Sequence, residues 1–204
     1  PEMNAQLRNI VQKAKAAQMT NDAIDRAVKR GAGEIGGANF ESIIYEGYAP
    51  GGVALLIDVL TDNRNRSSAD VRAIFSKLGG SMAEPGSVAW QFSRRGVIYI
   101  DGSVSEDDAM AAALEAGADD VVRDDTEFTI TTDPGALHAT KEGLESKKYK
   151  VADAELAWVP KSTVKVEGSA ADQLMKLLEA LEELDDVQKV DANFEMDDDA
   201  MAEA

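Results

Sequence analysis

The chain has 204 residues, no cysteine, and a net charge of −17 from 38 Asp and Glu against 21 Lys and Arg. The absence of cysteine excludes disulfides, thiolate catalysis and zinc sites built on sulfur. No run approaches the roughly 18 apolar residues that a membrane-spanning helix needs, so we expect no membrane contact and a cytoplasmic location.

The N-terminal segment predicts two short helices. Apolar side chains recur at helical spacing in residues 7–14, and Thr20 is a suitable N-cap for a second helix that ends at Gly31. Two short helices cannot enclose a core, so the pair either packs on the rest of the chain or has lost a partner upstream. We assign residues 1–37 to a helical domain that is truncated at its N-terminus and ends in a flexible linker at 31–37.

The next segment, residues 38–94, predicts a thin α/β layer. Its expected elements are strands at 41–48 and 53–60, a helix at 68–78 and a strand at 87–93. A single helix leaves much of the apolar face of such a sheet exposed. Residues 161–204 predict a final βαβ, with strands at 163–166 and 187–194, which we expect to return and complete the central sheet.

A self-contained pattern begins at Arg94-Arg95-Gly96 and ends at Pro160. Its expected elements are a strand at 97–100, a helix at 107–116, strands at 119–122 and 127–131, a helix at 135–147 and a strand at 151–158. That order, βαββαβ, is the ferredoxin-like unit. The expected fold class is therefore α+β and multidomain, with 95–160 inserted in a central α/β domain of 38–94 and 161–204. The acidic tail from Asp197 is expected to fray.

An anion site is expected where the predicted helix at 68–78 begins. Ser67 and Asp70 have the spacing of a capping box, and two arginines come just before them. A helix N-terminus is electropositive, so arginines there are unfavourable unless an anion offsets them. The candidate nucleic-acid-binding residues are Asn63, Arg64, Asn65, Arg66 and Arg72, extended by Arg94, Arg95, Lys29 and Arg30.

A second interpretation of these arginines stays open. Asp58, Asp62 or Asp70 could pair with them and only stabilise the turn, since surface pairs of this type are common and weak. For Lys29 and Arg30, the last turn of a helix favours cations without any ligand.

Residues 48–52, Tyr-Ala-Pro-Gly-Gly, predict a type II turn between two strands. Such a turn lets a nucleotide approach the backbone, with Tyr45 or Tyr48 as a stacking face. A purely structural turn is the favoured interpretation.

The charge is distributed unevenly. Residues 96–160 hold five Lys and Arg against fifteen Asp and Glu, and residues 161–204 hold four against thirteen. The N-terminal half is slightly positive by comparison. The acidic half could keep nucleic acid on the opposite face, bind a basic protein, or simply keep the chain soluble.

Enzymatic residues are scarce. His138 is the single histidine and lies within a predicted helix, without a nucleophile nearby. The motif G-x-G-x-x-G at 31–36 follows a helix, which is the wrong context for a dinucleotide. Acidic doublets such as Asp119-Asp120 lack the spacing of a calcium loop. We expect no enzyme, no cofactor and no metal.

Four motifs in this chain resemble those of the YebC family. They are Tyr45-Glu46-Gly47-Tyr48-x-Pro-Gly-Gly, Thr61-Asp62-Asn63-Arg64-Asn65-Arg66, Gly86-Ser87-Val88-Ala89-Trp90-x-Phe92 and Ala113-Leu114-Glu115-Ala116-Gly117-Ala118-Asp119-Asp120. The resemblance covers essentially the whole chain. It implies a helical bundle and two α/β domains, one of them ferredoxin-like and inserted in the other.

The same resemblance implies a function. The family is labelled a probable transcriptional regulatory protein and includes the mitochondrial translational activator of cytochrome c oxidase. We therefore expect a non-enzymatic DNA-binding regulator of gene expression. The alternatives are a translational activator that binds rRNA or mRNA on the ribosome, and an acidic protein-interaction module. No helix-turn-helix and no RNP-like strand pair decides between DNA and RNA.

One departure concerns the N-terminus. Family members begin with a basic segment containing Gly-His-Ser-Lys-Trp and a first long helix, and this chain has neither. We expect the natural N-terminus to lie upstream of Pro1.

Overall fold

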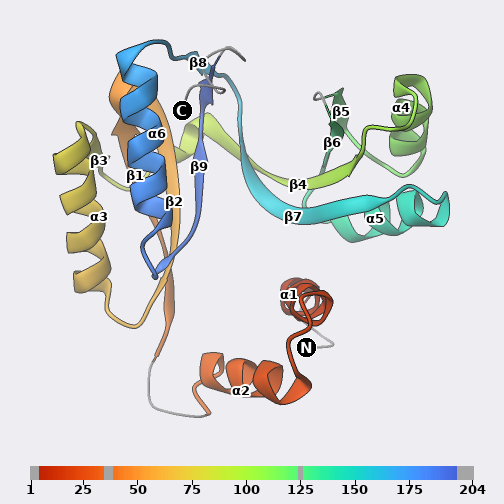
Figure 1. Ribbon diagram of the computed structural model, residues 1–204, viewed down its shortest axis with the longest axis horizontal. Coiled ribbons are helices and arrows are strands. Elements are labelled where there is room, and N and C mark those ends of the chain that lie inside the picture. Colours follow the sequence, from red (N-terminus) through yellow and green to blue (C-terminus); the bar gives the residue numbers. More distant parts are fainter. Residues whose placement is uncertain (1–4, 35–38, 124–125, 197–204) are drawn as a thin grey trace.

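Two four-stranded sheets, joined by one long pair of strands, form the frame of the computed structural model. The two N-terminal helices lie beside these sheets (Figure 1). The structure describes residues 5–34, 39–123 and 126–196. Residues 35–37 of the expected linker and the acidic tail from Asp197 lie outside these ranges.

The two predicted N-terminal helices are confirmed as α1 (Ala5–Ala16) and α2 (Asn21–Gly31). Thr20 caps α2, since its hydroxyl oxygen accepts the Ala23 N–H at 3.3 Å. α1 reaches the second sheet, where Lys13 Nζ donates to Asp153 in β7 (Val151–Pro160) at 2.7 Å. α1 therefore contacts the second sheet through this ion pair, in line with one of the two expectations.

The first sheet has the order β3-β1-β2-β9, and all its neighbours are antiparallel. Its strands are β1 (Glu41–Ala49), β2 (Val53–Thr61), β3 (Ser81–Ala83) and β9 (Val187–Ala192). β2 is apolar and almost entirely buried, as expected of a central strand. Two helices, α3 (Arg64–Leu78) and α6 (Ser169–Glu182), cover one face, where Phe75, Leu174 and Leu177 pack on Leu55 and Ile57.

Two predictions for this sheet are wrong in detail. Residues 87–91 form no strand, because the N–H groups of Gly86, Val88 and Ala89 all donate to the buried carboxylate of Glu46. A 3-10 turn, η2 (Ala89–Gln91), lies there, and β3 is the edge strand instead.

Of the final βαβ, only β9 returns to the central sheet. The strand expected at 163–166 is the short β8 (Val164–Lys165), which pairs in parallel with β10 (Phe194–Glu195). The two form a separate ribbon, so the helix α6 connects strands of different sheets.

The second sheet confirms the ferredoxin-like order. Its elements are β4 (Phe92–Asp101), α4 (Glu106–Glu115), β5 (Asp120–Arg123), β6 (Glu127–Thr132), α5 (Leu137–Ser146) and β7. The strands lie in the order β5-β6-β4-β7, all antiparallel, and both helices pack on the core around Ile98, Phe128 and Leu144. The α+β fold class is confirmed.

No break occurs at the expected boundary of residues 94–96. β4 runs through it and stays paired with β7 from Phe92 opposite Pro160 to Ile100 opposite Val151. The start of this ribbon packs on the open face of the first sheet, where Phe92 meets Ala54 and Leu56 of β2. The division into three domains stays a prediction.

The junction between the sheets also carries charge. Lys189 of β9 donates to Glu155 of β7 at 2.6 Å and lies 3.6 Å from Asp191. Burial raises the pKa of Asp58 and of Asp191, although Lys189 opposes both shifts and Arg94 opposes that of Asp58. Figure 1 shows the ribbon of β4 and β7 extending from one sheet to the other. None of the described helices is long and apolar enough to cross a membrane.

Candidate nucleic-acid interface

The expected anion site lies at the N-terminus of α3, but the helix begins earlier than predicted. Asn63 is the N-cap, since its side chain accepts the Arg66 N–H at 3.2 Å. Its own N–H donates to Thr61 Oγ1 at 2.9 Å. The capping box predicted from Ser67 and Asp70 is wrong, because Ser67 is buried inside the helix and donates to the Asn63 carbonyl. The arginines therefore lie within the first turn.

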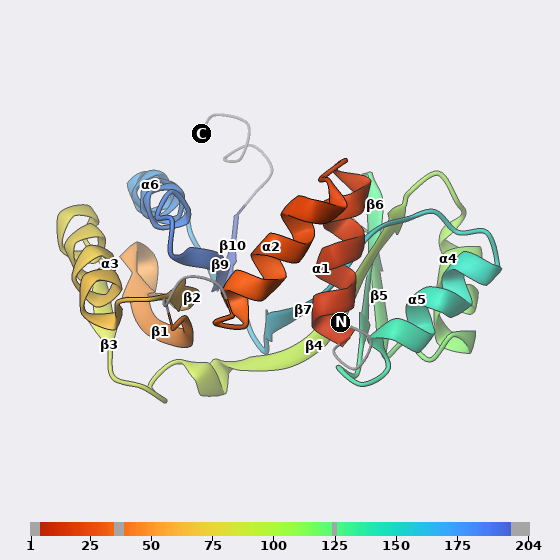
Figure 2. The same ribbon diagram turned by 90° about the horizontal axis from the view of Figure 1, so that it is seen from below.

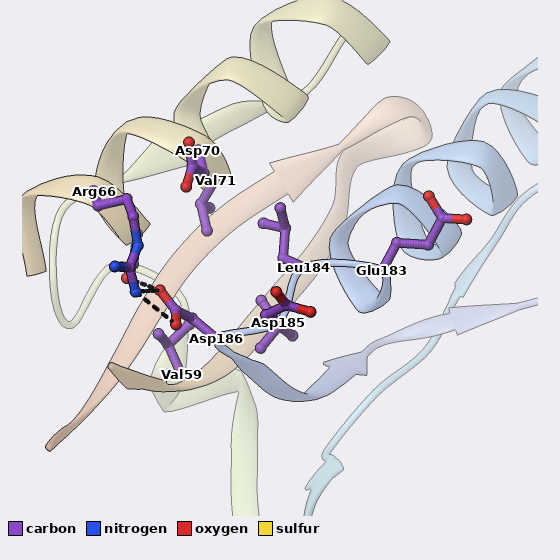
Figure 3. A pocket seen from close by; sticks show the side chains of 10 residues that line it. Val59, Arg66, Asp70, Val71, Glu183, Leu184, Asp185 and Asp186 are labelled. Carbon is purple, nitrogen blue, oxygen red and sulfur yellow. Dashed lines mark hydrogen bonds and ion pairs between the residues drawn. The ribbon is translucent and has the colours of Figure 1, made fainter. Parts of the chain in front are cut away.

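The anion that offsets this cluster comes from the protein itself. Asp186, in the turn between α6 and β9, accepts Arg66 Nη2 at 2.9 Å on both oxygens. It also accepts Ser67 Oγ at 2.6 Å and Thr61 Oγ1 at 3.1 Å. Arg66 makes a further pair with Asp62 at 3.0 Å. Figure 3 shows the Arg66 guanidinium turned onto the Asp186 carboxylate.

These contacts hold both partners in their charged forms. The Ser67 hydroxyl, followed by Arg66 and Thr61, lowers the pKa of Asp186, and burial only partly opposes the effect. The hydrogen bond from Arg66 to Asp186 in turn raises the pKa of Arg66. For Arg66 the structure thus favours the second interpretation, an intramolecular pair that stabilises the turn.

The cavity beside this pair is acidic. Its volume is about 520 Å³, and Asp70, Glu183 and Asp185 line it together with Arg66 and Asp186 (Figure 3). One arginine against four carboxylates does not attract a phosphate. Among the described residues, no group of three or more His, Asp or Glu side chains has the arrangement of a metal site.

The other candidates on α3 behave differently. Arg64, Asn65 and Arg72 are exposed, and their side chains make no hydrogen bond or ion pair within the described part of the chain. Arg64, Ser68 and Arg72 are four residues apart, so they form one row along the helix surface. Ser68 and Arg72 also line a second cavity, of about 460 Å³, beside β1 and β3.

Arg94 and Arg95 lie in β4, away from that row. The Arg94 guanidinium is stacked 5.2 Å above the Trp158 ring and 4.0 Å from the Asp58 carboxylate. Arg95 pairs with Asp119 at 3.0 Å. Arg94 and Arg95 thus each lie beside a carboxylate of the protein itself. Lys29 and Arg30 lie in the exposed last turn of α2, where the helix dipole favours cations.

Neither candidate stacking residue presents a free ring. Tyr45 packs on the core beneath α3, and its hydroxyl donates to the Arg64 carbonyl at 3.3 Å. Tyr48 packs beside Phe92, and its hydroxyl donates to the Ser87 carbonyl at 3.4 Å.

Three important residues were not among the sequence candidates. Asp186 follows Asp185 in an acidic doublet, and nothing local links it to Arg66, 120 residues away. Glu46 and Trp90 were noted only within family motifs. A lone acid between two tyrosines in a predicted strand was the available signal for Glu46, because a buried carboxylate needs several donors.

Glu46 is 6 % exposed and accepts three backbone N–H groups, at 2.6, 2.6 and 2.9 Å. Burial alone would raise the pKa of Glu46, but these hydrogen bonds outweigh it and lower the pKa. The carboxylate therefore stays charged and fastens the segment before β4.

Comparison with known proteins agrees with this architecture. Residues 40–194 match the family described as TACO1/YebC second and third domain, and residues 1–34 match the TACO1/YebC protein N-terminal domain. A relative from Gemmatimonas aurantiaca, named a probable transcriptional regulatory protein, is 60 % identical over 202 residues, which is 98 % of this chain and 82 % of the relative. One of the same name from Pelotomaculum thermopropionicum is 48 % identical over 97 % of this chain and 83 % of its own.

A solved structure is also similar. The crystal structure of a conserved hypothetical protein from Aquifex aeolicus has a TM-score of 0.89 and 45 % identity, and covers 97 % of this chain and 82 % of that one. Both family matches and these identities over nearly the full length show that the chain belongs to the TACO1/YebC family.

Proposed function

We propose that this protein is a non-enzymatic regulator of gene expression that acts by binding nucleic acid, with DNA as the leading ligand. Relatives of 60 % and 48 % identity carry the name probable transcriptional regulatory protein. The observation that supports binding is the row of Arg64, Ser68 and Arg72, whose two arginines have no acid of their own among the described residues.

The row suits phosphate oxygens. Arginine is a fork-shaped donor that matches a phosphate, and the adjacent N-terminus of α3 adds the positive end of a helix dipole. Asp186 leaves these two arginines unneutralised, because its contacts are with Arg66, Ser67 and Thr61. Contacts of this type position a protein on a backbone and do not read its sequence.

The experiment is a salt titration of binding to a DNA duplex, followed by fluorescence anisotropy. We expect Arg64→Ala and Arg72→Ala each to weaken binding and to lower the slope of log K against log salt by about 1. Lys77→Ala is the matched control, since Lys77 is an exposed cation in the last turn of the same helix. Equal losses in all three variants would mean that only net charge matters, and the proposal would fail.

Two alternatives give different results. If the protein binds ribosomal or messenger RNA, it should co-sediment with translating ribosomes, and Arg64→Ala should abolish this. It should also show no large affinity ratio between one DNA site and random DNA at fixed salt. An acidic module that binds a basic protein predicts that charge reversal within residues 185–199 removes function while the α3 variants leave it intact.

A further inference from the structure

The segment between β3 and β4 is held rigidly although the short turn η2 is its only regular element among the described residues. Glu46 binds it from beneath through three backbone N–H groups, and Gln91 Nε2 donates to the Tyr48 hydroxyl at 3.4 Å. The Gln91 carbonyl accepts the Lys161 N–H at 2.8 Å. The backbone around η2 is thus fixed before any ligand binds, which lowers the entropy cost of binding.

Trp90 projects from this rigid segment. It is 67 % exposed, the largest value among the exposed large hydrophobic side chains of the described residues. Its Nε1–H donates to the Ser87 carbonyl at 2.9 Å, so the polar edge of the ring is satisfied inside the loop. What remains open is apolar ring surface. Figure 2 shows the turn at the start of β4 at the outer edge of the molecule.

Lys161 Nζ donates to the Trp90 carbonyl at 2.7 Å, so the loop that carries the ring also holds a cation. The other large hydrophobic side chains exposed on the first sheet, at Phe40, Ile44 and Leu60, lie towards the opposite end of the β1–β2 hairpin from Tyr48. A protein interface needs an apolar core around its aromatic anchor, whereas base stacking needs one flat ring and a nearby cation.

We propose that Trp90 is the stacking residue for an unpaired base of a single-stranded nucleic acid, with Lys161 placed to meet an adjacent phosphate. This inference rests on the proposed function and narrows its ligand to a strand with accessible bases. The sequence offered Tyr45 or Tyr48 as a possible stacking residue, and this inference moves that role to a ring that the fold leaves exposed.

The test uses the Trp158→Phe background, in which Trp90 is the one remaining tryptophan of two. Addition of a short oligouridylate is expected to quench Trp90 fluorescence, and a duplex of the same length is expected to quench it less. Trp90→Ala is expected to weaken oligouridylate binding by about 5- to 150-fold, which is the range for loss of one stacked base.

Trp90→Phe is the matched variant. Both substitutions remove the bond to Ser87, but phenylalanine keeps an aromatic face, so most of the affinity should survive. Equal losses in the two variants would trace the effect to the loop and overturn the inference. Urea unfolding of each variant checks that the fold is intact.

Two further outcomes separate this inference from the proposed function. Oligouridylate binding that Trp90→Ala leaves unchanged, or binding of the duplex without binding of oligouridylate, overturns the stacking role alone, and is the result expected if Trp90 contacts a protein instead. No binding of either probe overturns the proposed function and the inference together.

Discussion

The Asp186 carboxylate holds the Arg66 guanidinium at 2.9 Å and joins the turn before β9 to the first turn of α3. Asp186→Asn keeps the shape but removes the charge that Ser67 and Thr61 also bind. Because both hydroxyls are buried, we expect a loss of about 1–3 kcal/mol in the free energy of unfolding. Urea denaturation measures it. Asp185→Asn, an exposed neighbour with the same change of charge, should stay near wild type, and a similar loss there would refute a specific role.

The same carboxylate predicts a pH dependence. The folded pKa of Asp186 is lowered, so its contribution is present above the unfolded value, about 3.9, and is lost as pH falls through the folded pKa. The difference in unfolding free energy between wild type and Asp186→Asn should therefore be constant from about pH 5 to 8 and shrink below about pH 4. A difference that grows in acid would contradict this assignment.

Lys189 is expected to hold the junction between the two sheets. It lies opposite Asp58 in the sheet and beside Glu155 and Asp191, and the last two raise the pKa of Lys189 against the effect of burial. Lys189→Met leaves the acids without that cation and should cost about 1–3 kcal/mol, below the 3–5 of a fully buried pair because the side chain is 31 % exposed. Lys176→Met on the exposed side of α6 is the control in thermal unfolding. Equal changes in Tm would argue against a specific junction.

Gly47 should tolerate no side chain. A Cβ there would lie 2.5 Å from the Phe75 ring and 2.9 Å from the Ser81 carbonyl, so Gly47→Ala forces β1 away from α3. We expect a loss of about 1–3 kcal/mol from overpacking, measured by urea denaturation. Gly31→Ala, with nothing within 4 Å of its Cβ, should change stability by less than about 0.5 kcal/mol. Equal losses of unfolding free energy in the two variants would contradict the steric role of Gly47.

Local patterns predicted most of the fold. The 3.6-residue period of α6 and the apolar run of β2 were visible in the sequence, and the order of elements in 95–160 indicated the ferredoxin-like sheet. The strand expected at 87–93 failed over 87–91, because an apolar residue such as Val88 also suits a buried loop and because the N–H groups there go to Glu46. A side-chain acceptor 42 residues away leaves no local pattern.

The candidate site was only partly predictable for the same reason. The sequence places Arg64, Arg66 and Arg72 on one short segment, but it cannot show which of them has an acid nearby. Asp186 pairs with Arg66 only because α6 and β9 bring the turn between them next to the start of α3. The exposure of Trp90 likewise depends on where the loop is anchored, since tryptophan is usually well buried.

The long pairing of β4 with β7 has a mechanical consequence. A flexible tether would let the two sheets turn independently, but a hydrogen-bonded ribbon resists bending, and Phe92 anchors one end of it against β2. The ribbon therefore keeps the surfaces of the two sheets at a fixed separation. A partner that touches both must match that spacing in its own structure.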